Sequence, residues 1–121
     1  MKNLPILIRN VKIIFPTSIL PGAVIVEDGK IKDVICGNPQ IDVEQMQVVD
    51  GEENYLSPGF IDVHTHGAGN ADFMDATETA VQTAIKMHLQ HGTTSIVPTT
   101  LTSTKESLME FLKFFNSIPL V

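Results

Sequence analysis

One stretch decides the fold that this sequence predicts: Pro58-Gly59-Phe60-Ile61-Asp62-Val63-His64-Thr65-His66-Gly67. Its Pro-Gly start is a turn signal, and the apolar run that follows is typical of a β-strand. Side chains alternate between the two faces of a strand, so Asp62, His64 and His66 are predicted to point to the same side. Two imidazoles placed in this way can bind one metal ion together.

A His-x-His pair on a strand is also compatible with two partly exposed polar side chains that have no function. The context favours the metal site, because the strand opens at Pro-Gly, closes at Gly67 and Gly69, and precedes a helical pattern. Asp62 shares the face of the histidines, and two roles are open for it. Its carboxylate either supports a metal ligand by orienting one of the imidazoles, or accepts a hydrogen bond from the backbone.

Beyond this strand, the sequence alternates between helix and strand patterns. We predict a helix over Asp75–His91 with Asp75 and Glu78 as a capping pair, and a strand over Thr93–Thr100. Ser103 has the capping-box spacing that opens a second helix. The predicted buried face of that helix contains Leu108, Met109, Leu112 and Phe115, and is widened by Phe111 and Phe114.

This order of strand, helix, strand and helix is typical of a parallel α/β array. Ligands in such arrays bind beyond the carboxyl ends of the strands. His64, His66 and the tip at residues 99–102 are therefore predicted to lie together. His88 and His91, three residues apart on the first helix, are predicted to have surface or helix-end roles, with metal chelation as the alternative.

Residues 1–57 have the pattern of a small antiparallel β unit. Strands are predicted over Leu4–Phe15, with a bend at Arg9-Asn10, and over Ala23–Val26 and Ile31–Ile35, which Asp28-Gly29 joins as a hairpin. Short strands at residues 47–50 and 55–56 follow. We therefore divide the chain into residues 1–57 and 58–121, the second being the part that carries the histidines.

The composition limits the partners that the chain is expected to have. Its 121 residues have a net charge of −6, which argues against nucleic acid and against an anionic membrane surface. Pro5, Arg9, Lys12 and Pro16 interrupt the apolar N-terminal stretch, so we expect neither a signal peptide nor a membrane span. The cytoplasm is the expected location.

Four segments resemble a known family. LSPGFIDVHTHG (residues 56–67) resembles the first barrel strand of the amidohydrolase superfamily, and EDGKIKDVI (27–35) is similar to a hairpin in the small β-sandwich of those enzymes. GAGNADFMDAT (67–77) and HGTTSIVPTTLTS (91–103) are similar to the N-acetylglucosamine-6-phosphate deacetylases within it. The resemblance covers nearly the whole chain.

The resemblance implies an α/β fold: the N-terminal half of a β-sandwich, followed by the first two β/α units of a truncated (β/α)8 barrel. It implies that His64 and His66 bind a divalent metal, zinc or iron. The implied reaction removes the acetyl group from N-acetylglucosamine 6-phosphate, giving glucosamine 6-phosphate and acetate. The other metal ligands and the general acid/base of the family are not in this sequence, so we name no catalytic residue and expect the chain alone to be inactive.

Two other interpretations stay open. The first is another amidohydrolase, a cyclic amide hydrolase or a deaminase. The second is a non-catalytic β/α module that oligomerises, because a truncated barrel leaves open strand edges and uncovered apolar faces. On either enzyme interpretation we also expect a homo-oligomer, and the substrate of the deacetylase is a small amino-sugar phosphate.

Overall fold

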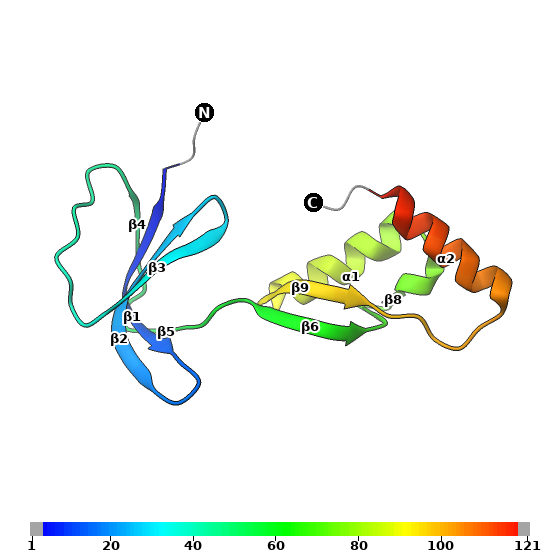
Figure 1. Cartoon of the computed structure of the whole chain (residues 1–121), viewed down its shortest axis with the longest axis horizontal. Coiled ribbons are helices and arrows are strands. Elements are labelled where there is room, and N and C mark those ends of the chain that lie inside the picture. The colour runs from blue at the N-terminus through cyan, green and yellow to red at the C-terminus, as the bar shows by residue number, and fades with distance from the viewer. Residues whose placement is uncertain (1–3, 119–121) are drawn as a thin grey trace. The chain divides into compact units, whose positions relative to one another are not determined.

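The computed structural model of the chain describes residues 4–118 (Figure 1). The chain divides into two compact units, Met1–Pro58 and Gly59–Val121, where the sequence predicted a boundary after residue 57. The first unit is a β-sheet, and the second unit combines strands with two helices. Neither helix within residues 4–118 is long and apolar enough to cross a membrane.

The first unit is a five-stranded sheet in the order β3-β2-β1-β4, with β5 also paired to β1. Its strands are β1 (Ile6–Ile14), β2 (Ile19–Glu27), β3 (Lys30–Cys36), β4 (Gln47–Asp50) and β5 (Tyr55–Leu56). β2 runs antiparallel to both β1 and β3, and the turn between β2 and β3 is the predicted Asp-Gly turn. Val11, Ile13 and Val24 form a buried cluster in this unit.

The prediction of a purely antiparallel unit was wrong, because β4 and β5 both pair with β1 in parallel. β1 contains a bulge at Arg9 and Asn10, where Asn10 has a φ of 55° and the register with β2 shifts. β4 pairs with β1 from Ile6 to Arg9, and β5 pairs with it beyond the bulge, at Lys12 and Ile13. The N–H of Gly51 donates to the carbonyl of Arg9 at 2.8 Å, which holds the turn between the two short strands against the bulge.

The second unit contains the predicted parallel strand pair. It consists of β6 (Phe60–Thr65), β7 (Gly67–Ala68), β8 (Ala71–Asp72), the 3₁₀ turn η1 (Phe73–Asp75), α1 (Glu78–Gln90), β9 (Thr93–Pro98) and α2 (Lys105–Ser117). β6 pairs with β9 in parallel, and β7 and β8 form a small hairpin. α1 packs against β9 and this hairpin, while α2 packs against η1 (Figure 1).

Both helices begin one or more residues later than the sequence predicted. α1 begins at Glu78, because the Thr77 hydroxyl caps it by accepting a hydrogen bond from the N–H of Ala80 at 3.2 Å. Asp75 instead completes a capping box with Asp72 around η1. The N-cap of α2 is Thr104 rather than Ser103, since the Thr104 hydroxyl accepts from the N–H of Ser107. In each case a threonine adjacent to the first turn is the cap.

The buried face of α2 also differs from the predicted one. Phe111 is the buried residue of this helix, whereas Met109 and Leu112 are 43% and 56% exposed. The reason is the position of Phe73 in η1, which is fully buried and whose ring meets the edge of Phe115. Phe73, Phe111, Val81 and Ala84 together form the buried core of the second unit.

Apolar side chains on both faces of β6 remain uncovered. Phe60, Ile61 and Val63 are 61%, 70% and 70% exposed, although all three lie in a strand. Strands of a parallel α/β array are usually covered on both faces. Within residues 4–118 the strand has only β9 as a paired neighbour, so these side chains have no covering layer.

Candidate metal centre

The two histidines of the predicted metal pair lie at the carboxyl end of β6. His64 is within the strand, and His66 follows its last residue, Thr65. The ring centroids of His64 and His66 are 5.2 Å apart, with the ring planes at 84°. His66 thus stands in the connection between β6 and β7, and a separate contact is needed to fix its ring.

That contact comes from the residue after β9. The Nδ1 atom of His66 lies 2.9 Å from the carbonyl oxygen of Thr99. A carbonyl oxygen only accepts hydrogen bonds, so Nδ1 of His66 must donate and therefore carries a proton. In the neutral ring this leaves the lone pair on Nε2. A metal-binding histidine typically donates its other ring N–H to a carbonyl or carboxylate in the same way, which fixes both the tautomer and the direction of the ring.

Backbone hydrogen bonds hold the peptide units around His66. The N–H of Thr99 donates to the carbonyl of Thr65 at 2.8 Å, and the N–H of Phe73 donates to the carbonyl of His66 at 2.8 Å. Gly67 follows with a φ of 152°, and a Cβ at this position would lie 2.1 Å from the carbonyl oxygen of Ala71. The close approach of the β7–β8 hairpin therefore requires glycine directly after His66.

Asp62 and His64 are linked through the backbone. The carboxylate of Asp62 accepts a hydrogen bond from the N–H of His64 at 3.1 Å, which is the backbone role that the sequence left open. Orientation of an imidazole by Asp62 stays a prediction. The His64 ring has no hydrogen-bond partner within residues 4–118 and is exposed, so both of its nitrogens are accessible to a ligand.

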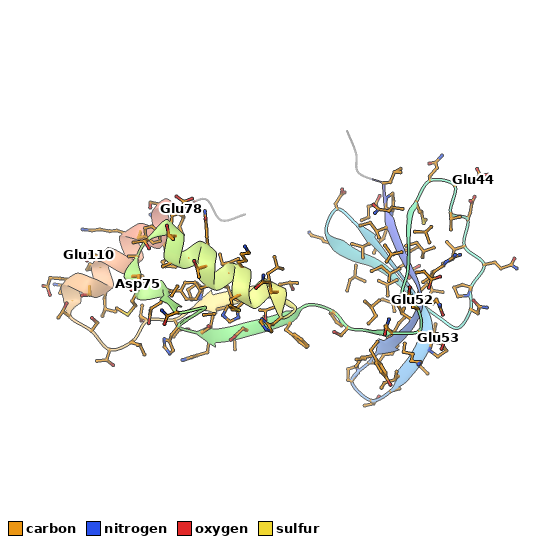
Figure 2. The ribbon with its side chains drawn as sticks, turned by 180° about the vertical axis from the view of Figure 1, so that it is seen from behind. Glu44, Glu52, Glu53, Asp75, Glu78 and Glu110 are labelled. Carbon is orange, nitrogen blue, oxygen red and sulfur yellow. The ribbon has the colours of Figure 1, made fainter. Side chains whose placement is uncertain are left out.

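The other candidate ligands are engaged elsewhere. The ring of His88 is 3.1 Å from the Thr65 hydroxyl, and the ring of His91 is 2.9 Å from the carbonyl of Met87 in its own helix. These two rings have separate partners, as expected for helix side chains that do not chelate a metal together. Figure 2 shows Asp75, which belongs to the capping box of η1.

The donor set fits a metal ion in part. Histidine nitrogens suit zinc and iron, and the Nε2 lone pair of His66 together with the open ring of His64 offers two donors. Across residues 4–118, no group of three or more His, Cys, Asp or Glu side chains is placed to hold a metal ion. Since catalytic zinc typically has three protein ligands, the pair alone forms part of such a site.

The sequence indicated part of this geometry and missed the rest. It predicted that the tip at residues 99–102 lies beside the two histidines, and Thr99 contacts one of them, His66. It gave no role to Thr65 or to the Thr99 carbonyl. Thr65 could have been noticed, because alternation along the strand places it on the face opposite to His64 and His66.

Comparison with known proteins agrees with this fold and this strand. Residues 55–116 match the amidohydrolase family. The chain belongs to this family. The amidohydrolase match covers strands β6 to β9, helix α1 and all but the last residue of α2, and it includes His64 and His66.

Among curated relatives, an N-acetylglucosamine-6-phosphate deacetylase of Bacillus subtilis is 30% identical over 108 residues, 88% of this chain and 27% of that protein. An adenine deaminase of Desulforamulus reducens is 35% identical over 61 residues, 49% of this chain and 10% of that protein. The crystal structure of the N-acetylglucosamine-6-phosphate deacetylase from Pasteurella multocida superposes with a TM-score of 0.81 and 26% identity, covering 93% of this chain and 30% of that one.

These findings confirm the resemblance to the amidohydrolases and to the deacetylases among them. They also confirm an α/β fold similar to part of a deacetylase. The chain spans about a quarter of the length of the Bacillus subtilis relative, 27%.

Proposed function

We propose that this chain is part of a metal-dependent amidohydrolase that removes the acetyl group from N-acetylglucosamine 6-phosphate, yielding glucosamine 6-phosphate and acetate. The observation that carries the proposal is the His66–Thr99 contact, which leaves a lone pair on Nε2 of His66 beside the open ring of His64. The similarity of most of the chain to two deacetylases supports the choice of substrate. The parent fold that we propose is a (β/α)8 barrel with a small β-sandwich.

In this proposal His64 and His66 hold the metal, and the backbone carbonyl of Thr99, directly after β9, holds the His66 ring. A divalent ion bound there supplies Lewis-acid stabilisation for the negative charge that develops on the acetyl oxygen during attack by water. The Thr99 carbonyl keeps the His66 ring in one tautomer and one direction. Hydrolysis breaks the amide C–N bond, transfers the hydroxyl of water to the acetyl carbon, and transfers a proton to the leaving amine.

The remaining donors and the group that protonates the amine are proposed to come from residues other than those described. Support for this comes from the lack of any third His, Cys, Asp or Glu side chain gathered with the pair within residues 4–118. We therefore propose that the 121 residues bind metal weakly and do not turn over substrate by themselves. The identity of the metal and the cytoplasmic location stay predictions.

Deamination is the second candidate reaction. It is favoured by the 35% identity with an adenine deaminase, which extends over about half of the chain. The two reactions share hydrolytic attack at a carbon bonded to nitrogen, and the histidine pair serves either one. The longer match to the Bacillus subtilis deacetylase, over 88% of the chain, favours deacetylation.

A homo-oligomer is the form that we propose for the isolated chain. The exposed apolar side chains Phe60, Ile61 and Val63 support association, because adjacent apolar side chains on a strand are rarely left in water. Light scattering on wild type and on the Ile61→Lys/Val63→Lys variant tests this. Dimers or larger species in wild type and monomers in the variant are expected, and a monomeric wild type contradicts the proposal.

The central test combines metal content with two assays. The metal content of the purified chain is measured by elemental analysis after dialysis against Zn²⁺ and compared with that of the His64→Ala/His66→Ala variant. Acetate release from N-acetylglucosamine 6-phosphate is measured beside ammonia release from adenine. We expect metal in wild type alone and turnover in neither protein.

Substrate preference is tested by binding to the Co²⁺-loaded chain. A change in its visible spectrum on addition of N-acetylglucosamine 6-phosphate, and not of adenine, supports the deacetylase. The reverse preference supports deamination, and equal metal content in both proteins contradicts the metal centre.

A further inference from the structure

Thr65 is a buried polar residue in the middle of the histidine pair. Thr65 is 7% exposed, and it is the one buried polar residue in the part of the chain that the structure describes. It is the last residue of β6, with His64 before it and His66 after it. A buried hydroxyl needs hydrogen-bond partners, so the groups around Thr65 indicate what holds this end of the strand.

The Thr65 hydroxyl has two partners, one on each side. Its Oγ1 atom lies 3.2 Å from the carbonyl oxygen of Gly67 and 3.1 Å from Nε2 of His88. The carbonyl only accepts, so the hydroxyl proton is directed to Gly67. The lone pairs of Oγ1 then remain for His88, which donates from Nε2. The two contacts together assign the proton of the neutral His88 ring to Nε2.

This arrangement connects α1 to the turn that carries His66. His88 lies in the last turn of α1, while Thr65 and Gly67 flank His66 directly. The backbone of Thr99 makes two further hydrogen bonds: its N–H donates to the Thr65 carbonyl, and its carbonyl oxygen accepts from Nδ1–H of His66. The segment Thr65–Gly67 is thus held from the helix by a side chain and from the second strand by the backbone.

We propose that His88 is a positioning residue for the metal pair, acting through the hydroxyl of Thr65. The inference rests on the proposed function, in which His64 and His66 bind the ion. His88 does not bind the ion: its Nε2 donates to Thr65, and its neighbour His91 has a separate partner within α1. What His88 contributes is a fixed direction for the Thr65–Gly67 segment, and therefore a fixed separation of the two ligand rings.

The first arm of the test measures Co²⁺ affinity of the full 121-residue chain by titration with visible absorption and calorimetry. His88→Leu and Thr65→Val are expected to weaken binding about tenfold, the lower range for residues that support metal ligands. His88→Gln is expected to restore wild-type affinity, because the Gln side-chain amide nitrogen occupies nearly the place of Nε2 and donates in the same way. His91→Leu is the matched control and is expected to bind as wild type does.

The second arm needs no metal. Amide hydrogen exchange is measured for Phe73 and Thr99, whose N–H groups donate to the carbonyls of His66 and Thr65. In His88→Leu these two amides are expected to exchange faster than in wild type, relative to amides in the middle of α1. The ratio removes any effect of lower overall stability. His88→Gln is expected to return both rates to the wild-type ratio.

The two arms separate the possible failures. If His88→Leu lowers the thermal midpoint but leaves the Co²⁺ affinity and the exchange ratios unchanged, His88 only packs against the strand and the inference is wrong. If wild type binds no Co²⁺, the proposed metal centre fails, and the exchange ratios still decide whether His88 positions the segment. If His88→Gln behaves as His88→Leu does, the donated hydrogen bond is not the cause.

Discussion

The Nδ1 atom of His66 lies 2.9 Å from the carbonyl oxygen of Thr99, a residue 33 positions further along the chain. This contact joins the carboxyl end of β6 to the carboxyl end of β9, which are neighbours because the two strands are parallel. The ring direction of His66 therefore depends on correct pairing of the strands. A metal ligand placed in this way is preformed only when the second unit has folded.

The tautomer of His66 is the first prediction. In the metal-free chain, the ring is expected to have its proton on Nδ1, because the Thr99 carbonyl accepts it. Long-range ¹H–¹⁵N correlation spectra report the tautomer, and Zn²⁺ addition is expected to shift the Nε2 resonance while Nδ1 stays protonated. His91 is the control, since its Nδ1 also faces a carbonyl, that of Met87. It should show the same tautomer and no response to Zn²⁺. A His66 proton on Nε2 contradicts the assigned hydrogen bond.

The glycine after His66 gives the second prediction. Gly67→Ala is expected to destabilise the second unit by about 3 kcal/mol, since the added Cβ overlaps the Ala71 backbone and has to displace the hairpin. Gly69→Ala, in the same hairpin, is the matched control. Its φ is 63°, but its Cβ would meet only side-chain atoms at 3.3 Å or more, so a cost of about 1 kcal/mol is expected. Urea unfolding followed by circular dichroism measures both, and equal losses would rule out the steric argument.

Local signals in the sequence predicted most elements of the fold. The Asp28-Gly29 turn and the strand patterns on either side of it need only nearby residues. The turn was found where predicted, and both strands extend beyond their predicted bounds. The parallel pairing of β4 and β5 with β1 was missed, because it depends on the bulge at Asn10 and on contacts about 40 residues apart. Overlapping apolar stripes on α2 were not resolved either, since burial of Phe111 depends on the distant Phe73.

The same distinction applies to the candidate site. The sequence could predict His64 and His66, because side-chain type and strand alternation carry the signal. A backbone carbonyl such as that of Thr99 carries no residue signature, so its role as the partner of His66 required the structure. Thr65 and His88 are 23 residues apart, and nothing in either local pattern indicates that they meet.

Phe73 gives the third prediction, on the core of the second unit. Phe73→Ala is expected to cost about 3–5 kcal/mol, because the side chain is fully buried and its removal leaves a cavity beside Phe111 and Phe115. Met109→Ala is the control on α2, because Met109 is 43% exposed, and its loss is expected to be under about 1 kcal/mol. Urea unfolding monitored separately in each unit by hydrogen exchange is the measurement. The first unit should be unaffected, and a similar loss in both units would contradict a core confined to the second.

Asp50 in the first unit gives the last prediction, on pH. The pKa of this carboxyl is held below its ordinary value of 3.8, mainly by the hydrogen bond from the backbone N–H of Glu52 and then by Asn10, with the Arg9 guanidinium adding a smaller contribution. A folded-state pKa below the unfolded one means that the carboxylate favours folding. This stabilisation is therefore complete above pH 3.8 and is lost as the pH falls through the lower, folded-state value.

Asp50 precedes the turn between β4 and β5 that contains Glu52 and Glu53 (Figure 2). Replacement of Asp50 by Asn keeps an oxygen that accepts from Asn10 and Glu52 but removes the charge. The stability difference between wild type and Asp50→Asn is expected to be small and constant from neutral pH down to about pH 4–5, and to shrink below that. Urea unfolding of the first unit at several pH values measures it. Asp33→Asn is the control, a charge change on the exposed strand β3 that leaves these hydrogen bonds intact. A difference that grows as the pH falls would mean that the turn stabilises the protonated carboxyl instead.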